Sequence, residues 1–115
     1  MTLKEISRAL DLEVLALPPE DGAAVTRAHA SDLLSDVLAN APAGGLLLTL
    51  QVHLNVVAVA VHAGLAGVVF TSGMRPDEAV LAKAVEEKLA LFATPDSTFE
   101  AAGKLYGLGI RGAHG

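Results

Sequence analysis

The chain contains a long uncharged segment, from Val37 to Met74, in which no Asp, Glu, Lys or Arg occurs. A segment of this composition must be buried, and we expect the charged remainder of the chain to surround it. Prolines, glycines and polar side chains interrupt the segment, so no window of about 18 clean apolar residues is left to span a membrane. The segment therefore predicts the core of a water-soluble fold.

The size of the chain indicates a single domain over residues 1–115. Hydrophobic residues make up 52% of the sequence but aromatic residues only 3%, so the core must be built from Leu, Val, Ile and Ala. A small chain this apolar leaves surplus apolar surface, and self-association is one way to cover it.

Charge and cysteine content exclude several classes of protein. The net charge is -5 and the eight Lys and Arg residues are scattered, so no basic patch is available for nucleic acid. The absence of Cys removes disulfides, Cys-bound zinc and iron–sulfur clusters held by this chain, and no cofactor is predicted. The N-terminal residues form a charged amphipathic pattern without the features of a signal peptide, which favours a cytoplasmic location.

Hydrophobic periodicity and capping signals predict alternating helices and strands. Capping boxes at Thr2–Glu5 and Ser97–Glu100 begin the first and last predicted helices. Ser31 and Asn55 are predicted to cap two further helices. Pro76 is predicted to lie in the first turn of another helix, whose inner face carries Leu81, Ala84, Val85 and Leu89. Gly109 is predicted to end the last helix. The predicted strands cover Glu13–Leu17, Val25–Ala30, Leu46–Gln51, Ala66–Thr71 and Leu91–Ala93. A turn is expected at Pro18, Pro19, Asp21 and Gly22, and a frayed tail at Arg111–Gly115.

The segment Asn55–Ala63 is rich in valine, which by propensity favours a strand. A parallel connection between the strands on either side of it, however, needs a crossover, which is usually a helix. We therefore predict a helix here, apolar on all sides and buried on both. The resulting order indicates an α/β fold with a mostly parallel sheet of about five strands and helices packed on its faces.

Polar residues follow three of the predicted strands, and in open α/β sheets ligands bind beyond the carboxyl ends of the strands. If these strands are neighbours, the polar residues share one rim, where helix N-termini could attract an anion. The candidate ligand-binding residues are Gln51, His53, Asn55, Thr71, Ser72, Thr94 and Ser97. The alternative is that Asn55 and Ser97 merely cap helices while the others solvate loops.

No catalytic constellation stands out. His53 has no identifiable partner, and His29, His53 and His62 lack the spacing of a helical metal-binding pair. The chain has neither a phosphate-binding loop around Lys104 nor a Gly-x-Ser-x-Gly elbow. A small phosphotransfer or hydrolytic enzyme would need a nucleophile–base pair, and none is evident, so we expect a non-enzymatic protein.

Three strings together resemble the DRTGG domain family. They are SDLLSDVLAN from Ser31, TLQVHLN from Thr49 and TPDSTFEAA from Thr94. The resemblance implies a fold similar to the N-terminal domain of HPr kinase/phosphorylase. It also implies a regulatory or dimer-forming role, as in related inserts between the CBS modules of regulatory pyrophosphatases. The string Asp-Arg-Thr-Gly-Gly itself is absent, so the family name transfers no binding residue to the loop that carries Gln51, His53 and Asn55.

Two functional hypotheses follow. The first is a homodimeric, non-enzymatic regulatory module that binds a small anionic or nucleotide-like ligand at the carboxyl ends of the strands. The alternative is a protein-interaction subunit of a larger redox or kinase complex, with no ligand of its own. A tightly bonded polar rim would favour the interaction subunit, and an open concavity would favour the ligand-binding module.

Overall fold

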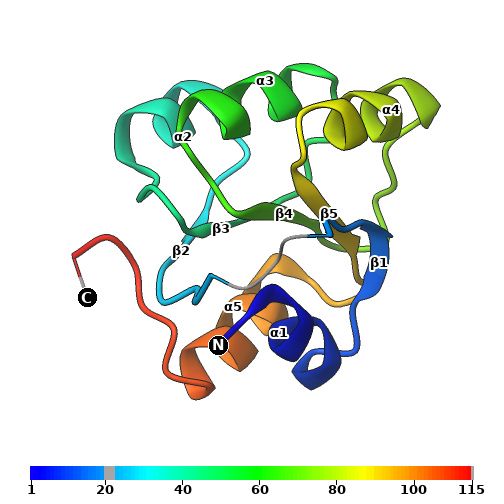
Figure 1. The fold of residues 1–115 in the computed structure, drawn as a ribbon. Coiled ribbons are helices and arrows are strands. Elements are labelled where there is room, and N and C mark those ends of the chain that lie inside the picture. The colour runs from blue at the N-terminus through cyan, green and yellow to red at the C-terminus, as the bar shows by residue number, and fades with distance from the viewer. Residues whose placement is uncertain (20–22, 115) are drawn as a thin grey trace.

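The structure, a computed structural model, describes residues 1–19 and 23–114 (Figure 1). Within them the chain forms helices and strands in the predicted order. The helices are α1 (Leu3–Ala9), α2 (Leu34–Asn40), α3 (Asn55–His62), α4 (Glu78–Glu86) and α5 (Thr98–Gly107). The strands are β1 (Glu13–Ala16), β2 (Ala28–Ala30), β3 (Leu46–Thr49), β4 (Gly67–Phe70) and β5 (Ala90–Ala93).

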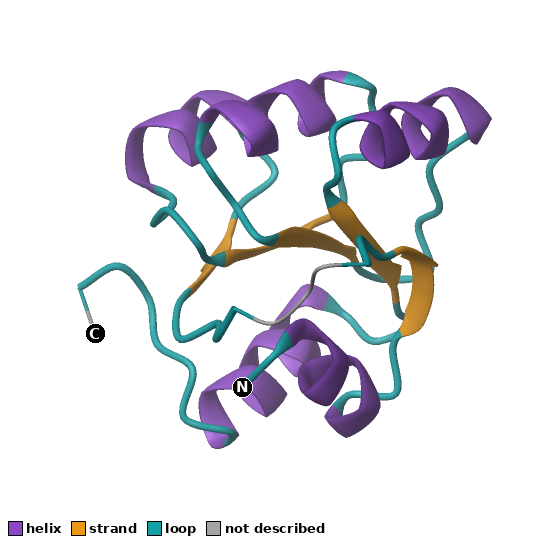
Figure 2. Cartoon of the chain, viewed as in Figure 1, coloured by secondary structure: helices purple, strands orange, loops and turns teal. Residues whose placement is uncertain are grey.

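The strands form one five-stranded sheet in the order β1-β5-β4-β3-β2. Every neighbouring pair is parallel except β1 with β5, which is antiparallel. Helices α2, α3 and α4 cover one face of the sheet, and α1 and α5 cover the other (Figure 2). The prediction of an α/β fold with a mostly parallel sheet is therefore confirmed.

The three central strands are buried along their whole length, as continuous apolar runs in a doubly covered sheet should be. Their side chains alternate between two cores. Leu48, Val69 and Phe92 belong to the core beneath α1 and α5. Phe70 and Leu91 belong to the core beneath α2, α3 and α4. The uncharged segment identified in the sequence supplies β3, α3 and β4, and so forms the middle of both cores.

Several local predictions are confirmed. The capping box at Thr2 and Glu5 is present, and the Ser97 hydroxyl accepts a hydrogen bond from the Glu100 amide at the start of α5. The valine-rich segment after Asn55 is a helix and provides the crossover between β3 and β4. Gly109, with φ of 98°, follows the end of α5 in the left-handed conformation that terminates helices.

The predicted starts of α2, α3 and α4 were wrong. Pro76 was expected in the first turn of α4, but that helix is capped by Asp77 and begins at Glu78. Ser31 does not cap α2, which begins after Leu33 without a side-chain cap. The intervening Asp32 is instead hydrogen-bonded to the end of β3 at Leu50, which keeps it out of the helix. Asn55 is the first residue of α3 rather than its cap, because the position before it is Leu54.

Two helix faces also differ from the prediction. Val85 was expected on the inner face of α4 but is 66% exposed, and Val80 is buried in its place. Helix α3 is buried along Val56 and Val57 but leaves Val61 exposed, so within this chain it is covered on one side.

The C-terminal residues are not simply frayed. The Arg111 amide donates to the Thr26 carbonyl, and the Ala28 amide donates to the Arg111 carbonyl at 2.9 Å. The Arg27 guanidinium donates to the Gly112 carbonyl, and Ile110 is buried. Residues 110–112 therefore lie along the start of edge strand β2, which corrects the predicted tail as far as Gly112. The predicted turn at Pro18–Gly22 lies partly outside the described residues.

No helix in the part of the chain that the structure describes has the length and apolar character needed to cross a membrane.

Candidate functional site

A threonine stands at the carboxyl end of each of three adjacent parallel strands. Thr49 is the last residue of β3, and Thr71 and Thr94 come directly after β4 and β5. All three are buried, with 0%, 0% and 3% of their surface exposed. The polar residues were expected to share one rim if these strands were neighbours, and β3, β4 and β5 are neighbours in the sheet. We call these three residues the threonine row.

At the β3 end of the row, the hydrogen bonds are already complete. One carboxylate oxygen of Asp32 accepts from the Leu50 amide at 2.7 Å and from the Thr49 hydroxyl at 3.1 Å. The Gln51 amide donates in turn to the Thr49 hydroxyl oxygen at 3.0 Å. Asp32 therefore fixes the backbone where β3 turns toward α3.

The middle of the row is joined to α5. The Thr71 hydroxyl lies 2.6 Å from the Thr98 hydroxyl and 3.4 Å from the Thr49 carbonyl oxygen. Since Thr98 is the first residue of α5, this contact ties the loop after β4 to the helix that follows β5. A buried hydroxyl needs a partner, and Thr71 finds its partners within the protein.

The start of α3 is similarly self-contained. The His53 amide donates to the side-chain oxygen of Gln51 at 3.2 Å, and the Asn55 amide donates to His53 Nδ1 at 3.1 Å. The Val56 and Val57 amides bond to the His53 and Leu54 carbonyls. Free N–H groups at a helix start are what would hold an anion, and these first N–H groups of α3 already have acceptors.

The loops after β4 and β5 are bonded to each other through their backbones. The Ser72 amide donates to the Asp96 carbonyl at 2.7 Å, and the Gly73 amide donates to the Thr94 carbonyl at 3.0 Å. The Thr94 hydroxyl accepts from the Asp96 amide. Ser72 is held at φ of 55°, a conformation that costs energy for any residue with a side chain.

Beside these loops lies a hollow of about 210 Å³ at the β5 end of the row. Its lining comes from the loops after β4 and β5 and from the start of β1, which meets this end because β1 is antiparallel. The lining residues are Asp11, Glu13, Gly73, Arg75, Ala93, Thr94 and Pro95. We call this space the rim hollow.

One ion pair lines the rim hollow, and a second involves Asp96, next to the lining residue Pro95. Both nitrogens of the Arg75 fork donate to the Glu13 carboxylate at 2.7 Å, and this bond lowers the pKa of Glu13. The Lys104 ammonium lies 2.6 Å from the Asp96 carboxylate, which raises the pKa of Lys104. The Arg75 and Glu13 side chains are each 56% exposed, so solvent screening makes their pairing weak.

Large apolar side chains are exposed at the same end of the sheet. Each of them follows the carboxyl end of a parallel strand along the chain. They are Leu33 after β2, Leu50 and Leu54 after β3, Met74 after β4 and Phe99 after β5. Phe99, in the first turn of α5, is 87% exposed. The surface of the rim thus carries exposed apolar side chains beside exposed polar ones such as His53 and Ser97.

The seven predicted site residues all lie at this end of the molecule, but they do not converge on one point. Thr94 lines the rim hollow, while Gln51, His53 and Asn55 form a chain of local bonds at the start of α3. Ser72 lies in the loop between β4 and α4, and Ser97 caps α5.

Sequence reasoning missed the contributions of Asp32, Thr98 and Glu13. The helix predicted to follow Ser31 included Asp32, whereas Asp32 precedes α2 and accepts a hydrogen bond from the Leu50 amide directly after β3. Glu13 reaches the rim because β1 runs antiparallel to β5, which no local pattern indicates. Among the described residues, no group of three or more His, Asp or Glu side chains is placed to hold a metal ion.

Fold and rim together define a mostly parallel α/β domain whose polar residues gather where its three central strands end. Residues 53–108 match the model of the DRTGG domain, so this part of the chain is similar to the DRTGG domain family. The resemblance inferred from the sequence is confirmed, although the Ser31–Asn40 string lies outside the matched residues.

A solved structure supports the fold. It is the crystal structure of the CBS and DRTGG domains of the regulatory region of Clostridium perfringens pyrophosphatase, complexed with the activator diadenosine tetraphosphate. The likeness has a TM-score of 0.73 at 15% sequence identity. It covers 90% of the present chain but 45% of the pyrophosphatase chain, so the present chain corresponds to less than half of that protein. No curated protein matches the chain.

Proposed function

We propose that the chain is a non-enzymatic regulatory module of the cytoplasm that binds a small anionic or nucleotide-like ligand at the carboxyl ends of its strands. The observation that carries this proposal is the rim hollow beside Arg75, at the edge where α/β sheets bind ligands. A DRTGG domain in the regulatory region of a pyrophosphatase, crystallised with a nucleotide activator, gives it further support.

Arg75 is the cation best placed to receive the anion. Its forked guanidinium matches a phosphate or carboxylate in two parallel hydrogen bonds. At present Glu13 occupies that fork. Because both partners are exposed and their pairing is weak, a phosphate could replace the Glu13 carboxylate at small cost.

The hollow, rather than the start of α3, is where we expect the ligand. The first N–H groups of α3 have acceptors, so His53 and Asn55 contribute shape and hydrogen bonds at the far side of the rim. Thr94 lines the rim hollow together with Arg75. Ser72 and Ser97 belong to the two loops that are hydrogen-bonded to each other beside it. Gln51 and Thr71 hold the rim in place through Thr49 and Thr98.

The test is a thermal-shift panel of adenine and guanine nucleotides, acetyl phosphate and inorganic phosphate. At a hundred times the dissociation constant, a ligand adds about 2.7 kcal/mol to the free energy of unfolding, which is a shift of several degrees. Arg75→Gln should abolish the shift. Glu13→Gln should increase the affinity for an anion, because it frees the Arg75 guanidinium and removes a negative charge beside it.

Arg8→Gln is the matched control, since it removes an exposed arginine from α1 on the opposite layer of the fold. It should bind as the unaltered chain does. The ligand proposal fails if no compound moves the melting curve at millimolar concentration, or if Arg8→Gln and Arg75→Gln reduce binding equally.

The alternative is a protein-interaction subunit of a larger redox or kinase complex. The observation that favours it is the set of exposed apolar side chains around the rim, above all Phe99. Apolar patches at the surface mark protein interfaces more often than sites for polar ligands. If the thermal-shift panel is blank, Phe99→Ser should reduce association with a partner while leaving the melting temperature nearly unchanged.

We further propose that the module is a homodimer that pairs through α3. Its outer face is free of charge, and Ala58 and Val61 are exposed there. A face without charges can meet a second copy without repulsion, although the chain as a whole carries a net charge of -5. Light scattering should give twice 11.7 kDa.

Val61→Lys should return the mass to that of a monomer, because it places two like charges across the pair. Val14→Lys is the matched control, since Val14 is similarly exposed but lies on edge strand β1. A monomer mass for the unaltered chain at high concentration would remove the dimer from the proposal and leave the ligand site untouched.

A further inference from the structure

The rim hollow is lined by groups of both charges. Among the described residues, its lining contains one cation, Arg75, and two carboxylates, Asp11 and Glu13. An anion that enters beside Arg75 therefore also meets the negative charge of these carboxylates, which opposes its binding. The space of about 210 Å³ is smaller than the range of about 300–1,000 Å³ that drug-sized ligands occupy. The hollow thus suits a small molecule that is not purely anionic.

The ion pair of Arg75 with Glu13 sets a requirement on any ligand that opens it. The two guanidinium nitrogens each donate to one oxygen of the Glu13 carboxylate at 2.7 Å. An acid group that takes the place of Glu13 leaves that carboxylate without its cation. A purely anionic ligand therefore provides a new partner for Arg75 alone. A ligand that also carries an ammonium group provides one for Glu13 as well.

Two further groups in the lining suit a ligand of this kind. Thr94 is 3% exposed, and its hydroxyl accepts a hydrogen bond from the Asp96 amide at 3.1 Å. No described residue accepts the hydroxyl proton of Thr94, so a ligand carboxylate can accept it. Asp11 forms no salt bridge with a described residue, so its carboxylate is open to an ammonium group.

We propose that the rim hollow binds a small zwitterion of the class of the α-amino acids. The ligand carboxylate takes the Arg75 fork and accepts from the Thr94 hydroxyl. The ligand ammonium group lies against the carboxylates of Glu13 and Asp11. A single carbon atom separates the two charged groups of an α-amino acid, so they can contact both former partners of the ion pair together. This inference rests on the ligand-binding role proposed above for the rim hollow, and it specifies the charges that the ligand carries.

The probes are the protein-forming L-amino acids, titrated into isotopically labelled protein while amide chemical shifts are followed by NMR. For each amino acid that binds, the analogue without the amino group and the analogue without the carboxylate are titrated in parallel. For L-alanine these analogues are propionate and ethylammonium. At least one amino acid should shift, in a saturable way, the amides of Asp11, Gly73, Arg75 and Thr94. Each analogue should bind about tenfold more weakly than its parent, because it lacks one set of charged hydrogen bonds.

Asp11→Asn separates the zwitterion from an anion. Asp11 has a φ of 53°, and asparagine tolerates this left-handed conformation as aspartate does. The variant should bind the amino acid about fivefold more weakly, the effect of one exposed charge pair, and should not bind propionate more weakly. Glu86→Gln is the matched control, since Glu86 is an exposed acid at the end of α4 and does not line the hollow. It should change the affinity less than twofold.

The proposal is overturned if no amino acid at millimolar concentration moves these amides, or if the analogue without the amino group binds as tightly as its parent. Equal effects of Asp11→Asn and Glu86→Gln would overturn it too. The thermal-shift panel separates this failure from that of the proposed function. Phosphate compounds that bind there, and lose binding in Arg75→Gln, leave the regulatory ligand site standing while the zwitterion is withdrawn.

Discussion

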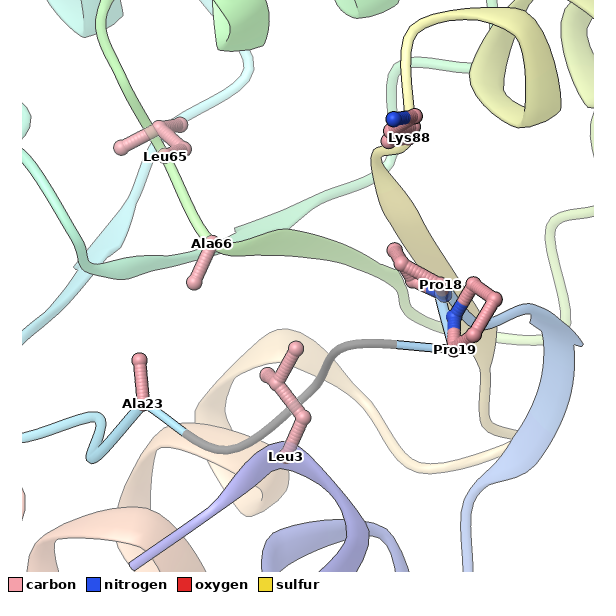
Figure 3. A pocket seen from close by; sticks show the side chains of 7 residues that line it. All are labelled: Leu3, Pro18, Pro19, Ala23, Leu65, Ala66 and Lys88. Atoms are coloured by element: carbon pink, nitrogen blue, oxygen red, sulfur yellow. The ribbon is translucent and has the colours of Figure 1, made fainter.

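The two ends of the central sheet are built in opposite ways. At the carboxyl ends of the strands, Asp32 is hydrogen-bonded to Thr49, Thr71 to Thr98 and Arg75 to Glu13, and a hollow of about 210 Å³ lies beside Thr94 and Arg75. At the amino ends lies a cavity of about 330 Å³, here called the amino-end cavity (Figure 3). Its lining residues among those that the structure describes are Leu3, Pro18, Pro19, Ala23, Leu65, Ala66 and Lys88. A ligand at the rim must replace a bond that exists, namely Arg75 with Glu13.

This difference separates stability from binding capacity. Polar groups that are buried and bonded fix one arrangement of the backbone, and they are costly to disturb. An unfilled apolar space forfeits packing contacts, and it can accept a ligand or a larger side chain. We therefore expect substitutions at the rim to lower the melting temperature and substitutions at the amino end to change it little or raise it.

The largest effect should come from Asp32→Ala. Asp32 accepts two hydrogen bonds at the end of β3, and hydrogen bonds to a charged group contribute about 1.5–3 kcal/mol each. Because Asp32 is exposed and solvent weakens both bonds, their combined loss should be smaller than the sum of these values. We expect the free energy of unfolding to fall by about 2–4 kcal/mol and the melting temperature by roughly 10 °C. Calorimetry of the two proteins measures the difference.

Asp32→Asn is the control for this change. It keeps one side-chain oxygen as an acceptor for the Leu50 amide and removes the charge. Its melting temperature should lie between those of the other two proteins. Equal stability of all three would show that the end of β3 does not depend on Asp32.

Thr71→Val should come next. It keeps the shape of the side chain but removes the hydroxyl that lies 2.6 Å from Thr98 Oγ1, and so leaves a polar group without its partner. Such a loss costs about 1–3 kcal/mol. Thr71→Ser retains the hydroxyl and should recover most of the stability in the same denaturant titration. A Val variant more stable than the Ser variant would contradict the role given to this contact.

Ala66→Leu should have a smaller effect, of opposite sign. Added carbons that fill an existing cavity restore packing, and we expect a gain of about 0.5–1 kcal/mol in the free energy of unfolding. The matched comparison is Gly67→Ala, one residue on. There an added methyl group would meet the Ala90 carbonyl oxygen at 3.1 Å, so that variant should be less stable. Thermal melts that rank the two variants the other way round would mean that the cavity is already filled by the protein.

The smallest effect on the melting temperature should come from Asp36→Asn, and it should depend on pH. Hydrogen bonds from Asn40, His29 and Ser31 lower the pKa of Asp36 from 3.8 to about 2. A carboxyl group whose pKa is lower in the folded state stabilises the fold above its ordinary pKa. That contribution disappears as the pH falls from about 3.8 to about 2. Asp36→Asn should therefore melt below the unaltered chain at pH 5, and the gap should narrow toward pH 2. A gap independent of pH would contradict this.

Sequence patterns were sufficient to predict that helices pack on both faces of a buried, mostly parallel sheet. Continuous apolar runs predicted the buried strands β3 and β4, and the need for a crossover correctly overruled the strand propensity of the valines in α3. The polar residues at strand ends were correctly placed on one rim, because parallel strands bring their carboxyl ends together. These inferences depend on local periodicity and on chain connectivity, which the sequence contains.

The sequence could not supply contacts between distant segments. Asp32 was predicted to lie in a helix because it follows the expected cap Ser31. Its actual partner, the Leu50 amide, is 18 residues away, and no local pattern indicates that contact. Arg75 finds Glu13 across 62 residues, and the antiparallel course of β1 decides that meeting. The amino-end cavity is a space left between five segments, so no residue within it carries a recognisable pattern. The candidate ligand residues stay a prediction that the thermal-shift panel will test.

The strand-like contact of residues 110–112 with β2 has a consequence for synthesis of the protein. Arg27 and its acceptor Gly112 are 85 residues apart. At about 5–20 residues per second, a ribosome takes on the order of 4–17 s to make the chain between them. During that interval the outer edge of β2 has no partner, and an unpaired sheet edge is a template for association with other nascent chains. Slower translation of this stretch should therefore increase the fraction of chains that reach the insoluble fraction, without any change in the folded protein.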